Sequence, residues 1–259
     1  MINKNYLKKI RSRDKYIIRN FIYEKIAKTL IDSLDLITVK FDNILELGIN
    51  DYSIYKFLHK KNPLCNYLHN DISKNRIRIS YEKKFLEFDL DNWKLNKNCY
   101  DLIFSNMYIH LFDDIENILR KIQASLKKNG FLIFAIPDKN NIQQLLNSLI
   151  QTDLDLYQGV FRRINPTLEI DDMLLILKKL NFDIPTINTD KITIEYNKFD
   201  KLLNDIRSMC LTYCHKDKKS NFEKKNYFIK LEQNFKRKNY LNDSYILDLQ
   251  INYISAWKK

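Results

Sequence analysis

Glycine, proline and cysteine are scarce in this chain, and long apolar runs are missing. With only 3 glycines and 4 prolines among 259 residues, the sequence shows no flexible linker and no low-complexity tail. No apolar stretch is long enough to span a membrane, and the N-terminal residues Met1-Ile2-Asn3-Lys4 lack an apolar signal core. We therefore expect a globular cytoplasmic protein, or one of the mitochondrial matrix if the source is eukaryotic.

The 4 cysteines are sparse for a chain of this size, which favours reduced thiols over a disulfide framework. Cys210, Cys214 and His215 could share a helix face and hold a metal ion, but no second ligand pair accompanies them. Free thiols without a metal site are the default expectation.

Basic residues outnumber acidic ones, with a formal net charge of +12 and a pI of about 9.3. Most Lys and Arg residues occupy the polar faces of expected helices, so a solvated surface explains them and we expect no nucleic-acid partner. The densest run of positive charge lies between Lys216 and Lys238. A specific polyanion site there is the alternative that charge alone leaves open.

Apolar runs alternate with segments of helical periodicity through the first half of the chain. Expected strands cover residues 43–47, 66–71, 84–88, 100–105 and 131–136. Expected helices cover residues 14–35, 53–61, 73–79 and 115–126. This alternation indicates right-handed crossovers and a doubly wound, mostly parallel sheet of the Rossmann-like type.

The order of elements changes after Pro137. Expected helices cover residues 142–154, 170–180, 199–213 and 222–237, and extended segments cover 185–196 and 245–255. The fold class is therefore α/β, with an N-terminal helical segment (1–40), a core (41–140) and C-terminal additions (141–259). The additions supply a helical substrate cap and the last strands of the same domain.

Three acidic residues follow or end three of the expected strands. Glu46 lies in Asn43-Ile44-Leu45-Glu46-Leu47-Gly48, Asp71 closes the second strand and Asp89 follows the third. Ligands of open parallel sheets bind beyond the carboxyl ends of the strands. The three carboxylates are therefore expected to converge on one crevice.

The motifs Ile44-Leu45-Glu46-Leu47-Gly48, Asn70-Asp71-Ile72-Ser73, Phe88-Asp89, Tyr100 to Asn106 and Leu126 to Ile133 resemble those of class I S-adenosylmethionine-dependent methyltransferases. The resemblance is to the branch that contains malonyl-acyl-carrier-protein methyltransferase and the mitochondrial complex I assembly factor that hydroxylates an arginine. Similarity to the second continues through Arg11-Ser12-Arg13, Arg163 to Pro166, Asn188 to Thr193, Leu203 to Met209 and a segment ending at Trp257. It covers nearly the whole chain.

This resemblance implies that S-adenosylmethionine is the cofactor. Glu46 would then bind its ammonium group, Asp71 the ribose hydroxyls and Asp89 the adenine amino group, with Phe88 or Leu90 against the ring. The complete cofactor-binding set implied is Glu46, Gly48, Asn50, Asp71, Ile72, Asp89, Leu90, Ser105 and Asn106. Each acid taken alone could instead be a solvated residue or a helix cap.

Two positions depart from the family pattern. Asn50 and Tyr52 stand where the family has glycines. Asn tolerates left-handed backbone, but a left-handed tyrosine would cost about 1–3 kcal/mol. The Tyr52 ring must therefore swing outward or occupy cofactor space.

Methyl transfer needs alignment of donor and nucleophile more than a catalytic triad. Tyr108 and His110 follow the fourth expected strand and are the candidate catalytic residues, although a structural role at a helix entry would also explain His110.

Three functions remain open. The first is a methyltransferase acting on a small molecule, carrier-bound acyl group or protein. The second is an arginine-hydroxylase-like factor acting on a respiratory complex I subunit, and the third is a non-catalytic scaffold with a degenerate cofactor site.

Overall fold

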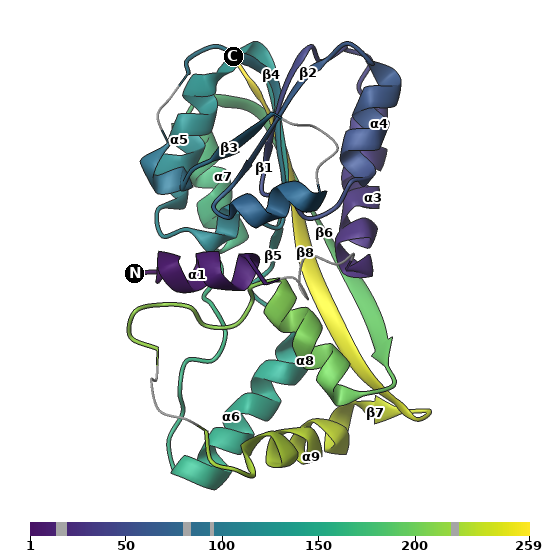
Figure 1. Cartoon of the computed structure of the whole chain (residues 1–259), viewed down its shortest axis with the longest axis vertical. Coiled ribbons are helices and arrows are strands. Elements are labelled where there is room, and N and C mark those ends of the chain that lie inside the picture. Colours follow the sequence, from purple (N-terminus) through teal and green to yellow (C-terminus); the bar gives the residue numbers. More distant parts are fainter. Residues whose placement is uncertain (14–19, 80–83, 94–95, 219–222) are drawn as a thin grey trace.

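The protein is built around one mixed sheet. A computed structural model describes residues 1–13, 20–79, 84–93, 96–218 and 223–259. Its eight described strands run in the order β3-β2-β1-β4-β5-β8-β6, with β7 paired to β8. Helices cover both faces of the sheet, and further helices lie beyond one end of it (Figure 1). The expected α/β class with a doubly wound, mostly parallel sheet is confirmed.

The first five strands are parallel to one another. They are β1 (Asn43–Leu47), β2 (Asn66–Asp71), β3 (Phe85–Glu87), β4 (Tyr100–Asn106) and β5 (Leu126–Pro137). The connecting helices are α4 (Ser53–Lys61), α5 (Ile115–Ser125) and the 3₁₀ turns η1 (Lys74–Ile79), η2 (Leu90–Asn92) and η3 (Ile109–Leu111). The carboxyl ends of these strands therefore meet at one edge, as the sequence predicts.

The last strands are antiparallel. β8 (Ser244–Lys258) lies between β5 and β6 (Phe182–Tyr196) and runs opposite to both, and the short β7 (Tyr240–Leu241) forms a hairpin with it. Both long strands extend past the parallel part of the sheet toward the lower helices (Figure 1). The extended segments expected at 185–196 and 245–255 are these two strands.

Two apolar clusters sandwich the sheet. Helices α3 (Phe21–Asp35) and α4 cover one face, where Ile44, Leu102 and Ile133 pack with Ile26 and Leu58. Helices α5 and α7 (Ile170–Lys179) cover the other face, which is formed by the alternate side chains of the same strands. Buried β5 is apolar on both faces because helices flank it on both sides.

The remaining helices lie at the carboxyl-end edge of the sheet. Helix α1 (Lys4–Arg11) and helix α8 (Phe199–Ser208) lie between that edge and helices α6 (Gln143–Tyr157) and α9 (Tyr227–Asn239) (Figure 1). Asn3 caps α1 by accepting from the Tyr6 amide at 3.0 Å, which defines where the helix begins. Among the described residues, none of the helices combines the length and apolarity needed to cross a bilayer.

Some boundaries differ from the sequence expectations. The helix expected at 14–35 is described only from Phe21, which follows the Asn20 cap, and residues 14–19 lie outside the described part. The helix expected at 199–213 ends at Ser208, because Cys210 adopts a left-handed conformation (φ 56°). The helix expected to begin at 222 is described from Tyr227, and 219–222 lie outside the description. Helix α1 has no counterpart among the expected helices.

Candidate functional site

The turn between β1 and α4 opens the candidate site. Gly48 has φ +83°, and its amide donates to the Asn70 carbonyl at 2.8 Å, which ties the ends of β1 and β2 together. A Cβ atom on Gly48 would come within 2.1 Å of the Tyr108 ring. Both the backbone conformation and this close packing therefore require glycine at position 48.

The Tyr108 ring fills the space above that turn. Its hydroxyl accepts a hydrogen bond from the Ile72 amide at 2.8 Å, so the side chain reaches from the end of β1 to the end of β2. Burial raises the pKa of Tyr108, and the nearby Asp71 raises it further, so the phenol stays protonated. Tyr108 thus occupies space that a ligand bridging β1 and β2 would need.

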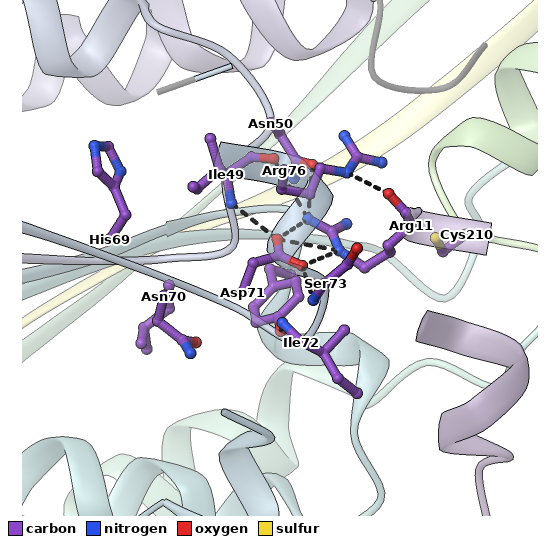
Figure 2. A network of polar contacts seen from close by, with 12 residues as sticks. Arg11, Ile49, Asn50, His69, Asn70, Asp71, Ile72, Ser73, Arg76 and Cys210 are labelled. Atoms are coloured by element: carbon purple, nitrogen blue, oxygen red, sulfur yellow. Dashed lines mark hydrogen bonds and ion pairs between the residues drawn. The ribbon is translucent and has the colours of Figure 1, made fainter. Parts of the chain in front are cut away.

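Asp71 is bound by the chain itself. The Arg11 guanidinium of α1 donates Nε to one carboxylate oxygen at 2.9 Å and Nη2 to the other. The Ile49 and Ser73 amides also donate to this carboxylate, at 3.2 and 3.0 Å. Both charged side chains are fully buried, and Arg11 reaches the Asp71 carboxylate directly (Figure 2). The arginine also lies over the Tyr108 ring. Burial lowers the pKa of Arg11, but the pairing with Asp71 more than offsets this.

A second buried arginine lies beside this pair. The Arg76 guanidinium donates Nε to the Arg11 carbonyl at 3.0 Å, while its buried Nη2 atom finds no hydrogen-bond partner in the described part of the chain. Burial and the positive charge of Arg11 lower the pKa of Arg76. Its guanidinium points away from the Asp71 carboxylate (Figure 2). The cluster therefore holds two guanidinium groups around one carboxylate.

Glu46 is bound on a different side of the strands. Its carboxylate accepts from the Tyr67 hydroxyl at 2.9 Å and lies 2.6 Å from Nδ1 of His69. The His69 ring is directed away from the Asp71 carboxylate (Figure 2). Burial raises the pKa of Tyr67, and the carboxylate of Glu46 raises it further. In this conformation Glu46 and Asp71 each contact side chains of the chain rather than a shared open hollow.

Asp89 pairs with the start of α1. Lys4 Nζ lies 2.5 Å from Asp89 and 2.6 Å from Asp91, and Asp89 also accepts from the Asp91 amide at 3.1 Å, as the cap of η2. Leu90 is fully buried in the apolar cluster on the α5 face. Phe88 stacks on Trp93 with ring centroids 5.5 Å apart.

Three cations of α1 therefore face the acidic carboxyl ends of β2 and β3. Lys4, Lys8 and Arg11 follow each other at intervals of a turn, which places them on one helix face. Lys8 Nζ lies 2.5 Å from Glu87. Two of the three carboxylates assigned to the cofactor are thus neutralised by α1. Sequence reasoning missed this helix, although its basic residues at helical spacing were a usable signal.

Polar residues at the ends of β1 and β4 form a network. Asn50 Nδ2 donates to the Asn106 carbonyl at 2.5 Å, and Asn106 Nδ2 donates to Asp51 at 2.7 Å. The Ser105 hydroxyl donates to the Leu47 carbonyl at 2.9 Å. Burial raises the pKa of Asp51 to about 6, although the Ser53 amide bonds to its carboxylate. A perturbed carboxyl group in this position is a candidate site residue that the sequence did not single out.

The departures at positions 50 and 52 do not strain the backbone. Tyr52 has φ −107° and stands directly before α4, with its side chain partly exposed. Asn50 is not among the described residues with positive φ. Neither residue needs the left-handed conformation that substitution of a glycine suggested, because the turn's single left-handed residue is Gly48.

His110 is poorly suited to accept a proton. Burial, together with Arg11, lowers the pKa of His110 to about 3, so the imidazole is neutral near pH 7. Both ring nitrogens are buried, and neither has a hydrogen-bond partner among the residues that the structure describes. An imidazole with so low a pKa binds a proton weakly and is therefore a poor general base near pH 7. Its catalytic role, like the roles of the nine cofactor residues, stays a prediction.

Several cavities lie away from this region. Within the described ranges, five cavities of about 360 to 550 Å³ are lined by other residues, and Glu46, Asp71 and Asp89 line none of them. For those described residues no cluster of metal-ligating side chains is found either, and Cys210 and Cys214 are buried free thiols.

Part of the core matches a known sequence family. Residues 45–134 match the model of a family described as a methyltransferase domain. The chain is 23% identical over 261 residues to a mitochondrial arginine-hydroxylase (NDUFAF5) of Dictyostelium discoideum, covering 92% of this chain and 60% of that protein. The human protein of the same name is 23% identical over 78% of this chain and 59% of its own length. The chain thus spans about 60% of the length of these relatives.

A malonyl-[acyl-carrier protein] O-methyltransferase of Calditerrivibrio nitroreducens is 29% identical over 48% of this chain and 50% of that protein. Among solved structures, the YcgJ protein of Bacillus subtilis superposes with a TM-score of 0.59 at 10% identity, covering 91% of this chain and 99% of that one. A phosphoethanolamine N-methyltransferase of Haemonchus contortus in complex with S-adenosylmethionine gives 0.52 at 16% identity over 92% and 56%. At these identities the structures show a shared fold.

Proposed function

We propose that this chain is a methyltransferase whose cofactor crevice is closed here by α1, because residues 45–134 match a methyltransferase-domain family and the fold resembles that of an S-adenosylmethionine-bound enzyme. Its substrate would be a small molecule, a carrier-bound acyl group or a protein. The observation that carries the proposal is the Gly48 turn, with acidic residues in β1, at the end of β2 and after β3. S-adenosylmethionine would supply the methyl group as a sulfonium.

The residue types at the crevice fit this cofactor, but their present partners must first leave. Asp71 would bind the ribose hydroxyls once Arg11 withdraws, and Asp89 would bind the adenine once Lys4 withdraws. Tyr108 would have to turn away from Gly48. An opening of α1 would therefore release both acids together, because Lys4 and Arg11 belong to the same helix.

A non-catalytic scaffold is the second candidate, and the Arg11–Asp71 pair favours it. A buried pair with two further backbone donors is a stable arrangement, and removing one partner of such a pair costs about 3–5 kcal/mol. If α1 never opens, the fold persists without a cofactor.

An arginine-hydroxylase-like factor of respiratory complex I is the third candidate. It is supported by relatives named as mitochondrial arginine-hydroxylases, one of which aligns with 92% of this chain. In that case the substrate would be a protein arginine, the partner a complex I subunit and the compartment the mitochondrial matrix. For the first candidate, the methyltransferase, we propose a cytoplasmic location.

Titration calorimetry with S-adenosylmethionine separates binding from scaffold functions. We expect wild type to bind, and Lys4→Gln/Lys8→Gln to bind more tightly, because a larger open fraction raises apparent affinity. Lys61→Gln is the matched control. It removes an exposed ion pair between Lys61 of α4 and Asp35 of α3, and this variant should bind the cofactor as wild type does. Absence of heat for all three proteins at millimolar cofactor would favour the scaffold.

A second comparison tests Asp71 as the ribose acceptor. Arg11→Met frees this carboxylate, whereas Arg11→Met/Asp71→Asn removes both charges and restores the balance of the pair. Loss of hydrogen bonds to a charged acceptor should weaken the double variant about tenfold or more relative to Arg11→Met. Equal cofactor affinities of Arg11→Met and Arg11→Met/Asp71→Asn would show that Asp71 does not bind the ribose. Mass spectrometry of modified substrate then distinguishes an added methyl group from an added hydroxyl.

A further inference from the structure

The cavity between α6, α8 and α9 is distinct from the crevice at Asp71. It measures about 530 Å³, within the range of about 300–1,000 Å³ that is typical of small-molecule sites. Its apolar lining comes from all three helices and includes Leu145, Leu149, Leu203, Ile206, Phe228 and Leu231. Phe228 remains 48% exposed, so apolar surface at this cavity meets water.

Positive charge surrounds that apolar lining. Besides Arg163, five cationic side chains line the cavity: Arg162, Arg207, Lys218, Lys224 and Lys225. The one lining acid, Glu223, is bound by Arg163, which also contacts Asp153 at 2.6 Å. The acid of the cavity is therefore already neutralised.

The lining cations have few partners of opposite charge. Arg207 contacts the Asn204 oxygen at 3.4 Å and lies over Phe228, and Lys218 donates to the Tyr6 hydroxyl at 3.0 Å. No ion pair of Arg207, Lys218 or Lys225 is found within the described part of the chain. An anion placed among these side chains would be stabilised by charge-assisted hydrogen bonds.

We propose that this cavity binds an anionic amphiphile, an apolar chain that carries a carboxylate or phosphate. The chain would pack on the leucines and Phe228, and the anionic group would lie among Arg207, Lys218 and Lys225. A purely polar anion would leave the apolar leucines exposed to water. A neutral lipid would leave the cationic side chains without a negatively charged partner. The combination selects a ligand with both properties.

Amphiphile binding at this cavity does not depend on methyl transfer. The segment after α8 separates the two regions. Cys210 lies beside Arg11 (Figure 2), whereas Thr212 and Tyr213 line the cavity. Amphiphile binding is therefore measured without S-adenosylmethionine, and a failure of either ligand to bind leaves the other result intact.

Titration calorimetry with dodecanoate, dodecyl phosphate, dodecanol and dodecyltrimethylammonium, each below its micelle-forming concentration, tests the site on the full chain. We expect one molecule of either anion to bind, with dodecanol about tenfold weaker or more and the cation not binding. Shortening the chain by one methylene should weaken binding about threefold to fourfold. The two anions separate fatty-acid from phosphate-headed sources. Equal binding of dodecanol and dodecanoate would overturn the proposal.

Variants of the exposed rim locate the site. Lys218→Gln/Lys225→Gln should weaken dodecanoate binding about tenfold or more and leave dodecanol binding unchanged. Lys236→Gln/Lys238→Gln on α9 removes the same charge outside the cavity lining and is the control. Unchanged affinity of the first variant would refute this location. Binding of a glutamate decapeptide, or of anionic vesicles, without binding of monomeric dodecanoate would instead identify a peptide or membrane surface and overturn the proposal.

Discussion

At the residue scale, Gly48 has two separate reasons to be glycine. Its left-handed backbone disfavours any side chain, and the Tyr108 ring leaves no room for one. Tyr108 in turn is held by the Ile72 amide and covered by Arg11. A substitution at position 48 therefore affects the whole contact between the ends of β1, β2 and β4.

Gly48→Ala should lower the free energy of unfolding by about 2–5 kcal/mol, from backbone strain and overpacking together. Urea denaturation followed by circular dichroism measures it. Gly159→Ala is the matched control, because a Cβ there would meet only a carbonyl oxygen 3.9 Å away. A change of under about 0.5 kcal/mol at position 48 would contradict the packing described here.

Asp51 gives a pH dependence whose sign follows from its raised pKa. The folded-state pKa of Asp51 is about 6, above the ordinary value of 3.8, so the folded protein binds the proton more tightly. The stability that this proton contributes is fully present below pH 3.8 and is lost as the pH rises through 6. One pKa unit corresponds to about 1.4 kcal/mol, so the loss is on the order of 1–3 kcal/mol.

Asp51→Asn should remove that loss. Stability curves of wild type and variant between pH 4 and 8, measured by chemical denaturation, should diverge as the pH rises, with the variant gaining relative to wild type. Asp32→Asn, an exposed position on α3, should keep the wild-type slope. Parallel stability curves for Asp51→Asn and wild type would show that the pKa of Asp51 in the folded protein is not raised.

At the element scale, α1 is attached largely through charge. Lys4, Lys8 and Arg11 pair with acids at the ends of β2 and β3, and only Leu7 and Ile10 add buried apolar side chains from the helix. A short helix with this few apolar anchors is expected to open more easily than the buried strands.

Lys4→Gln/Lys8→Gln should therefore increase hydrogen exchange of the α1 amides about fivefold or more, because about 1 kcal/mol of pairing is lost. Exchange in α5 should not change, and Lys61→Gln should leave α1 as it is in wild type. Raised salt should mimic the double variant, since exposed pairs are screened. Equal α1 exchange in wild type and double variant would refute the charged attachment.

At the scale of the whole molecule, β6 and β8 join the sheet to the lower helices. Both strands are 15 residues long, and the cluster that buries Ile133 also contains Leu231 and Phe235 of α9. The helical cap and the α/β core therefore share one apolar cluster and are expected to unfold together.

Leu231→Ala, at a fully buried position of α9, should cost about 2–5 kcal/mol. Tryptophan fluorescence reports on the core through Trp93 and Trp257, and far-ultraviolet circular dichroism reports on all helices. Both transitions should shift together to lower denaturant. Leu175→Ala on α7, 65% exposed, should change stability by under about 0.5 kcal/mol. Separate transitions for the two probes would mean that the cap unfolds by itself.

Elements of the core could be predicted because their signals are local. Residues 53–61 form the expected helix, and strand β2 ends at Asp71 as expected. The helix α1 was missed because its apolar residues are few and its contacts are with acids far along the chain. The end of α8 was placed too late, since the left-handed Cys210 is stabilised by Asn165, which bonds to its carbonyl.

The amino-acid sequence by itself determined the order of strands and helices, the glycine turn and the acids at the strand ends, because periodicity and turn chemistry act between near neighbours. Only the tertiary structure decided which groups those acids meet. Asp71 is paired with Arg11, 60 positions away, and Gly48 is covered by Tyr108, which belongs to a different strand end. Such pairings depend on how α1 and the β4 turn pack at the edge of the sheet, and that packing has no local signature.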